Sequence, residues 1–331
     1  MNADQSLPAR ICRSSASVQA LGIQDERIIG AFSLTLAWFA KPSQELGECD
    51  ADRFSRLPPF PIFKRMHENL TRLGLIEEDE IVLDEAALSL ALIDHPAMDL
   101  APYHDLLDAA ETRLDLLGRD AETSAERAEA LAAVLSGEFH FTGDVETYDD
   151  PANADLISVL DRRRGLPVSL SILWVAIARR LGWRADVLDV PGHVLVVVGA
   201  EATPVIVDPF AGGVRVGAER LVALLAGSGG SGPAVTHVAA MPNRAVLLRL
   251  IKNQASRAEQ AGEGRRALEL YVRMTTIAPA YPHAWWERAR LELVDQDIPS
   301  ARRSLGAILE ITRDPEVRRR VSKTLEGLPA S

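Results

Sequence analysis

Residues 156–213 constrain the fold of this chain most, because they combine a glycine turn, a long apolar run and two β-branched runs. The first part reads LISVLDRRRGLPVSLSILWVAIARRLGW, with Gly165 and Pro167 directly before the apolar run. Proline is favoured in the first turn of a helix, so this punctuation predicts a turn that leads into a helix. Ser169 then lies in the opening turn, near unpaired backbone N–H groups and the positive end of the helix dipole.

The second part, DVLDVPGHVLVVVGAEATPVIVDPFAGG, predicts an antiparallel hairpin. Its β-branched runs flank a turn near residues 200–203. If Gly199 lies opposite Pro204, then His193 and Asp208 share one face of the hairpin as diagonal neighbours. Such neighbours are about 7–8 Å apart at the backbone, close enough for an imidazole and a carboxylate to meet. A register shifted by one residue would separate them.

The order of Ser169, His193 and Asp208 suggests a nucleophile, a base and an orienting acid. A helix-borne nucleophile, a histidine at a strand start and an aspartate at the end of the next strand follow the order of the transglutaminase-like, papain-type core. A Ser-His-Asp triad is recognised by geometry and not by chain order, so these residues are candidate catalytic residues. The alternative is structural: Ser169 binds a first-turn backbone N–H, and His193 and Asp208 form a hydrogen bond without chemistry.

Four motifs carry a narrower resemblance: TYDDPANADLISVLDRRRGLPVSLS, LGW, VPGHVLVVV and IVDPFAGG, in this order. Together they resemble the SirB-type family of bacterial transglutaminase-like proteins, which carry tetratricopeptide-like helices at the C-terminus. The resemblance extends over residues 81–325. It implies an α+β fold: a transglutaminase-like core of a helix and an antiparallel β-hairpin sheet, between N-terminal helices and C-terminal tetratricopeptide-like helices. The expected domains are an extension over residues 1–80, the helical segment and core over 81–240, and the helical tail over 241–331.

The same resemblance implies that the catalytic cysteine is missing. Where active members of the fold carry cysteine after the glycine turn, this chain has Pro167, Val168 and Ser169, and its two cysteines, Cys12 and Cys49, lie far upstream. A cysteine beside a histidine can ionise at neutral pH, whereas a serine hydroxyl needs a well-aligned base and oxyanion donors. We therefore favour a non-catalytic or weakly catalytic protein that binds or regulates a polypeptide. The alternative is a serine-dependent amidase, protease or acyl transferase.

Four further residues are candidate binding residues. Tyr148 and Asn153 could line a pocket beside the helix, although Asp and Asn around a proline are also ordinary turn and cap residues. Arg164 and its two neighbouring arginines could clamp a carboxylate or phosphate, but three adjacent arginines point in different directions on a helix. Trp285 could contact a peptide in the helical tail.

The tail has the spacing of a helical repeat. Ala267 and Ala301 are 34 residues apart, and each opens a helix of similar layout, as expected for one tetratricopeptide unit with flanking half units. Helices of this kind offer a groove for a protein or peptide partner.

Composition narrows the class of protein. The formal net charge is −11, without a basic stripe interleaved with aromatic residues, so nucleic-acid binding is disfavoured. The early residues lack the apolar core of a signal peptide, and no apolar run is long enough to cross a bilayer, so we expect a cytoplasmic protein away from the membrane. His95, His104 and His140 lack metal-ligand spacing, and no phosphate-binding glycine loop is present, so we expect no metal and no cofactor. The sequence does not indicate the oligomeric state.

Overall fold

The computed structural model describes residues 69–190, 192–199, 203–226 and 239–329. The described residues divide into two compact units, one ending at Gln254 and the other beginning at Ala255. The boundary after Gln254 falls inside a helix. The expected division into a core over residues 81–240 and a tail over residues 241–331 stays a prediction. The expected extension over residues 1–80 lies mostly outside the described residues.

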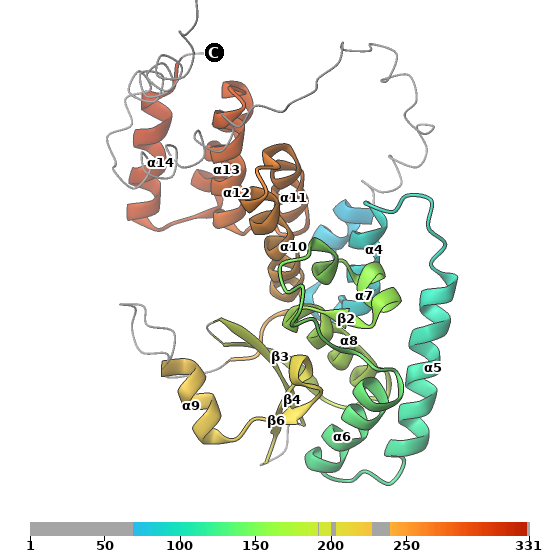
Figure 1. The fold of residues 1–331 in the computed structure, drawn as a ribbon. Helices are drawn as coiled ribbons and strands as arrows, with labels where there is room; N and C mark the ends of the chain where they lie inside the picture. Colours follow the sequence, from blue (N-terminus) through green and yellow to red (C-terminus); the bar gives the residue numbers. More distant parts are fainter. Residues whose placement is uncertain (1–68, 191, 200–202, 227–238, 330–331) are drawn as a thin grey trace, which may run out of the picture. The chain divides into compact units, whose positions relative to one another are not determined.

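The helices of the larger unit surround one central helix (Figure 1). A helical segment over residues 69–75 opens the described part. The helices that follow are η2 (Glu78–Glu80), α4 (Leu83–Leu92), α5 (Ala101–Gly118), α6 (Ser124–Leu131), the π-helix η3 (Ala132–Glu138), η4 (Pro151–Ala154), α7 (Leu156–Arg162), α8 (Pro167–Arg180), η5 (Pro209–Ala211), α9 (Ala218–Ala226) and α10 (Asn243–Gln260).

The central helix is α8, which begins where the sequence predicts. Pro167 occupies its first turn, after an extended Leu166. Every side chain from Pro167 to Ala178 is buried. A helix that is apolar on all sides belongs in the interior, because every one of its faces needs a packing partner. Trp174, which is fully buried, is among the largest side chains of this core.

The main sheet has four antiparallel strands in the order β3 (Ala185–Val190), β4 (His193–Val198), β5 (Val205–Asp208) and β6 (Val214–Arg215). Val197 pairs with Ile206, which is the register that the sequence predicts and which extends to Gly199 opposite Pro204. The predicted turn near residues 200–203 lies largely outside the described residues. A second, two-stranded sheet pairs β1 (Thr142–Gly143) with β2 (Arg164–Gly165) in parallel.

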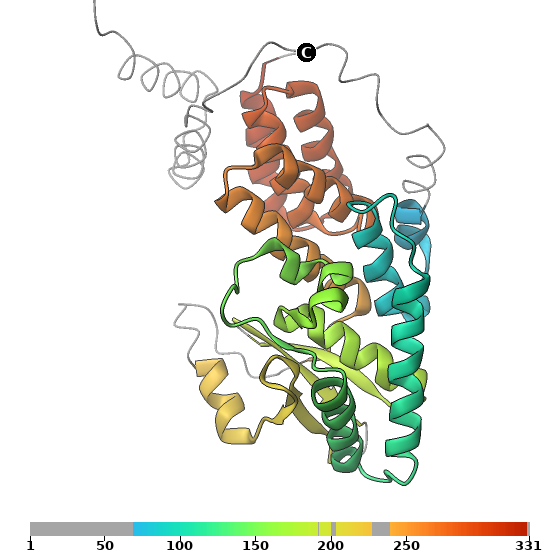
Figure 2. The ribbon, with the colours of Figure 1, turned by 45° about the vertical axis from the view of Figure 1, so that its right-hand side comes forward.

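Both faces of the main sheet are covered. On one face, Leu188, Val190 and Leu195 pack with leucines of the amphipathic helix α9. The opposite face contacts α8 and α6, and Val187 and Val196 are buried there. Figure 2 shows the sheet between α9 (yellow) and the green helices. Because successive strand residues point to opposite faces, a strand covered on both sides reads as a continuous apolar run, as VLVVV does in β4.

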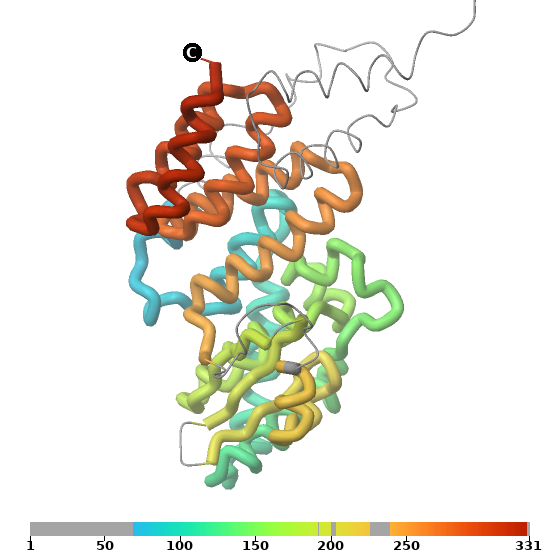
Figure 3. The backbone as a smooth tube through the Cα atoms, turned by 90° about the vertical axis from the view of Figure 1, so that its left-hand side faces the viewer, coloured from blue at the N-terminus to red at the C-terminus, as the bar shows by residue number. Residues whose placement is uncertain are grey.

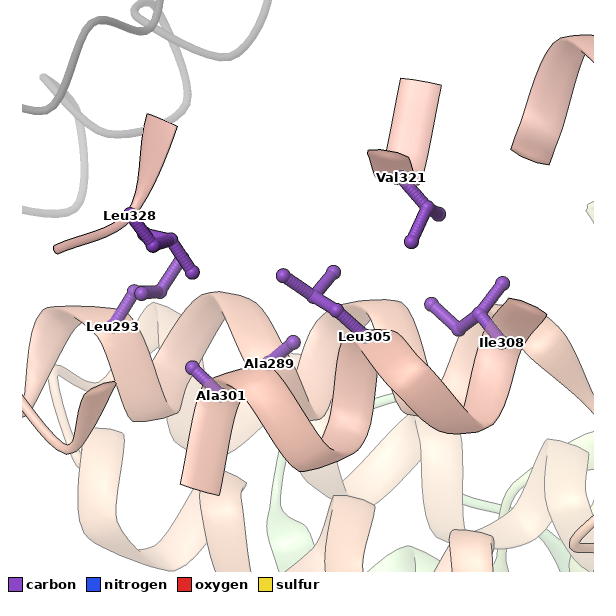
Figure 4. Close-up of a cluster of buried hydrophobic side chains, with 7 residues drawn as sticks. All are labelled: Ala289, Leu293, Ala301, Leu305, Ile308, Val321 and Leu328. Carbon is purple, nitrogen blue, oxygen red and sulfur yellow. The ribbon is translucent and has the colours of Figure 1, made fainter. Parts of the chain in front are cut away.

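The helical tail contains α11 (Gly264–Ile277), α12 (Pro282–Val294), α13 (Ile298–Ile311) and α14 (Pro315–Gly327). Proline stands in the first turn of α12, α13 and α14, and aspartate caps the last two. Ala267 and Ala301 are both fully buried near the starts of α11 and α13. α12, α13 and α14 share an apolar cluster, shown in Figure 4, with Leu293, Leu305 and Ile308 among its buried members. These are paired helices of similar length, and their tetratricopeptide-like nature stays a prediction.

No described helix combines the length and the apolar character that a membrane crossing requires.

Candidate functional site

Ser169 lies in the first turn of α8, as expected, but its hydroxyl faces the protein interior. The side chain is fully buried, and Oγ donates a hydrogen bond of 2.7 Å to the backbone carbonyl of Asn153. The same carbonyl accepts the backbone N–H of Leu166 at 3.0 Å. The structural alternative predicted that the Ser169 side chain binds a backbone N–H in the first turn of its own helix. This prediction is wrong, because the hydroxyl instead donates to a carbonyl of η4, sixteen residues upstream.

His193 and Asp208 form the pair that the register predicts. Nε2 of His193 lies 2.8 Å from Oδ2 of Asp208, and the two side chains are 18% and 19% exposed. Because an ionised carboxylate only accepts hydrogen bonds, a neutral His193 must carry its proton on Nε2 and keep Nδ1 as an acceptor. The pair therefore has the orientation that a general base requires.

Asp208 also builds the turn that follows β5. Its Oδ1 accepts the backbone N–H groups of Phe210 at 3.0 Å and Ala211 at 3.3 Å, so it caps the short helix η5. The cap directs the Phe210 ring against His193, with ring centroids 6.3 Å apart, and against Tyr148, with centroids 5.8 Å apart. Both contacts are edge-to-face, which aromatic rings favour.

The three candidate catalytic residues do not form a connected triad. Within the described part of the chain, no hydrogen bond joins Ser169 to His193. The serine proton is directed to the Asn153 carbonyl, whereas a nucleophilic serine donates its proton to the base. The arrangement is a polar His–Asp pair near the surface with a separate, buried serine.

Asn153 is a candidate for lining a pocket, with a turn or cap role as the alternative, and the structure places it in the interior. Its side chain is fully buried, Nδ2 donates to the carbonyl of Thr147 at 2.6 Å, and Oδ1 accepts from Arg162 at 2.8 Å. With its amide used inside the protein, Asn153 has no exposed group for a ligand. The alternative interpretation, that this segment supplies turn and cap residues, describes it correctly.

The acidic loop over residues 144–150 is held by the same network. Asp144 is almost fully buried and accepts the hydroxyl of Thr147 at 2.6 Å. That bond, with the backbone N–H of Thr147, lowers the pKa of Asp144 against the opposing effect of burial. Arg162 reaches Asp150 at 3.4 Å, so the first of the three arginines is an internal ion-pair residue.

Tyr148 and Arg164 lie on the surface. Tyr148 is 42% exposed above Phe210, so it is accessible to a ligand beside the His–Asp pair. Arg164 is half exposed and lies 3.1 Å from Glu146, which is 81% exposed. An ion pair so open to water is a weak one.

Trp285 belongs to the helical tail and is partly buried there. Its indole N–H donates to the carbonyl of Pro279 at 2.8 Å, and Arg288 lies over its ring at 5.2 Å. Trp285 and Trp286 both pack against the tail's apolar cluster. The exposed part of Trp285 is what a peptide could contact.

Sequence reasoning missed Phe210 and Gly143 as site residues. A Cβ atom at Gly143 would lie 2.5 Å from Cδ2 of Phe210, so only glycine lets η5 pack on β1. The sequence signal for Phe210 is an aromatic residue directly after Asp-Pro, at the end of the predicted hairpin. Among the residues that the structure describes, no three His, Cys, Asp or Glu side chains are grouped as metal ligands.

Replacing Asp208 by alanine should lower the free energy of unfolding by about 2–3 kcal/mol, because one change removes a helix cap and leaves His193 without its partner. Asp208→Asn keeps a capping oxygen and should cost less. Urea denaturation of both variants tests this expectation. An alanine variant as stable as the wild type would show that the pair does not hold η5.

Comparison with known proteins identifies the family. Residues 101–252 match the model of the Transglutaminase-like superfamily, so this part of the chain is a transglutaminase-like domain. A UPF0162 protein of Pseudomonas aeruginosa is 30% identical over 262 residues, which are 77% of this chain and 94% of that protein. The chain belongs to the UPF0162 family. A UPF0162 protein of Xylella fastidiosa is 28% identical over 247 residues, 72% of this chain and 87% of that protein.

A shorter likeness reaches beyond the UPF0162 family. Human F-box only protein 21 is 34% identical over 74 residues, which are 22% of this chain and 12% of the human protein. The superfamily match over residues 101–252 places helix α8 and the main sheet in a transglutaminase-like domain. The narrower SirB-type resemblance stays a prediction.

Proposed function

We propose that this UPF0162 chain is a SirB-type, transglutaminase-like protein without the catalytic cysteine, which binds a protein or peptide and has at most weak catalytic activity. The observation that carries the proposal is the Ser169 hydroxyl, which is fully buried and donates to the Asn153 carbonyl at 2.7 Å. For Ser169 to act as a nucleophile, this bond would have to break and the hydroxyl would have to reach both His193 and a substrate.

The surface beside His193 supports binding. Tyr148 is 42% exposed and Val145 is 77% exposed on the acidic loop, and Tyr148 stacks edge-on against Phe210, which touches His193. Rigid aromatic side chains supply contact area at a low cost in conformational entropy. The tail supplies paired helices, which are a second, separate candidate surface for binding.

The alternative function is a serine-dependent amidase, protease or acyl transferase. One observation favours it: Asp208 orients His193 so that Nδ1 stays an acceptor, as a base requires. It needs Ser169 to leave its buried hydrogen bond when substrate binds.

A fluorophosphonate probe separates the two functions. We expect no labelling of Ser169 in the wild-type protein, because the hydroxyl is buried and bonded to a carbonyl. The measurement is intact-protein mass spectrometry, with Ser169→Ala as the control for labelling elsewhere. An adduct on Ser169 that disappears in His193→Ala would contradict our proposal and support the serine-dependent enzyme.

A photo-crosslinking amino acid tests the binding surface. We expect a crosslinked partner when it replaces Tyr148, and none when it replaces Leu75, which is 78% exposed on a different segment. The measurement is a shift in mass on a denaturing gel after illumination of cells that express the variant. A crosslink at Leu75 alone, or equally at both positions, would contradict binding at Tyr148.

The tail is tested by a chain that ends after Gln260. A deletion from residue 241 would also remove α10, most of which belongs to the larger unit. We expect the shorter chain to keep its fold and lose the partner. Retention of the partner would limit binding to the transglutaminase-like domain.

A further inference from the structure

Helix α10 contacts the segment that carries His193. Arg249 lies 2.5 Å from Oδ1 of Asp189 through one guanidinium nitrogen and donates to the backbone carbonyl of His193 at 3.4 Å through the other. Asp189 is near the end of β3 and His193 begins β4. The guanidinium therefore spans the connection between the two strands.

The same helix contacts the segment that holds Ser169. Gln254 donates through Nε2 to the backbone carbonyl of Ala154 at 2.7 Å. Ala154 ends η4 and directly follows Asn153, whose carbonyl accepts the Ser169 hydroxyl and the Leu166 N–H. Arg249 and Gln254 are five residues apart, which is about 7.5 Å along a helix axis.

The first turn of α10 is itself anchored. Arg244 donates to the carbonyls of Leu73 and Ile76 at 2.7 and 2.6 Å, and Asn243 accepts from Arg179 at 2.8 Å. The segment before the helix pairs with β3 through Ala240 and Leu188. In Figure 3, α10 (light orange) starts beside the strands of the sheet. A helix fixed at its start can hold other segments in place.

We propose that α10 positions both polar parts of the candidate site: Arg249 holds the backbone of His193, and Gln254 holds the backbone that binds Ser169. Neither residue touches a reacting group, so both are positioning residues. The proposal rests on the proposed function only in taking these two segments as the site.

The solvent exposure of the Arg249–Asp189 ion pair distinguishes a positioning role from a contribution to overall stability. Arg249 is 28% exposed and Asp189 is 50% exposed, so their ion pair contributes little to the stability of the fold. Its specific effect is geometric, since a planar guanidinium can bind a carboxylate and a carbonyl together, and a lysine cannot reproduce that fork. Loss of the pair should therefore alter His193 without unfolding the chain.

The experiment uses two NMR reporters in the full chain without a partner. The first is the proton on Nε2 of His193, which is visible only while it is protected by Asp208. The second is the exchange rate of the Leu166 amide, which donates to Asn153. Arg249→Ala and Asp189→Ala should each lose the first signal and leave the second unchanged. Gln254→Ala should speed exchange at Leu166 about five- to tenfold, the loss of one hydrogen bond, and keep the first signal.

Two further variants make the result decisive. Arg249→Lys should lose most of the His193 signal, and Arg302→Ala, which alters an arginine that binds carbonyls in the tail, should leave both reporters unchanged. A His193 signal that persists in both Arg249→Ala and Asp189→Ala would overturn the proposal. Loss of both reporter signals in every α10 variant would also overturn the proposal, because it would show that these substitutions destabilise the whole unit. Because this experiment uses the chain without a partner, a negative result would reject the positioning role of α10 and would not bear on peptide binding.

Discussion

Replacing Arg180 by alanine should lower the free energy of unfolding by about 3–5 kcal/mol, because it leaves a buried carboxylate without its partner. Asp84 is fully buried and lies 2.7 Å from Arg180, which is 20% exposed. Asp108 lies 2.8 Å from the same guanidinium and Glu111 lies 3.3 Å from it. Burial alone would lower the pKa of Arg180, but the hydrogen bonds and charges of these carboxylates outweigh it and raise the pKa above its usual value.

The control for Arg180 is an arginine in an open ion pair. Arg113 binds Glu138 through two bonds of 2.7 Å, but both side chains are more than a third exposed. Arg113→Ala should therefore destabilise the chain far less than Arg180→Ala, because water already screens this ion pair. Urea denaturation of both variants measures the difference. Equal losses would show that burial of Asp84 does not decide the effect, and Arg180→Ala with Asp84→Asn should recover part of the stability.

Replacing Gly213 by alanine should cost about 3 kcal/mol or more, the sum of a steric clash and a strained backbone. A Cβ atom there would lie 2.2 Å from Cη2 of Trp174 and 2.8 Å from Cβ of Ala132. The φ angle is +84°, which other residues rarely adopt. Gly213 lies two residues after the end of η5, and its N–H binds the carbonyl of Asp208 at 2.8 Å. The clash should therefore also disturb the His193–Asp208 pair.

Gly182 supplies the matched control, because its φ is +71° and a Cβ there would meet nothing within 4 Å. Gly182→Ala should cost only the backbone penalty of about 1–2 kcal/mol. Thermal denaturation, monitored by circular dichroism, compares the stabilities of the two variants. If Gly213→Ala costs no more than Gly182→Ala, the packing of Gly213 against Trp174 is looser than the structure indicates.

Helix α8 and the hairpin are the parts of the fold that the local residue pattern predicts. Gly165, Pro167 and the apolar run predict the start of α8, and the structure places its first residue at Pro167. Counting back from the turn predicts the strand register, and with it the contact between His193 and Asp208. These features depend on the helical and strand periodicities and on neighbours across one short turn, so they can be read from the residues themselves.

The strands β1 and β6 and the π-helix η3 were not predicted. β1 and β6 have only two residues each, too few for an alternating pattern. The π-helix lies within a run that reads as an ordinary helix, because its wider hydrogen bonds leave no simple signal in the residue types. Each of these elements depends on what packs beside it.

The class of core, the central helix, the hairpin register and the absence of a cysteine at the helix start can all be predicted from the residues and their order. The atoms that those residues contact depend on long-range packing. It directs the Ser169 hydroxyl to the Asn153 carbonyl, pairs Arg162 with buried groups and leaves Arg164 near water. The physical reason is that periodicity specifies which face of an element is buried, whereas a hydrogen-bond partner depends on which distant segment folds against that face.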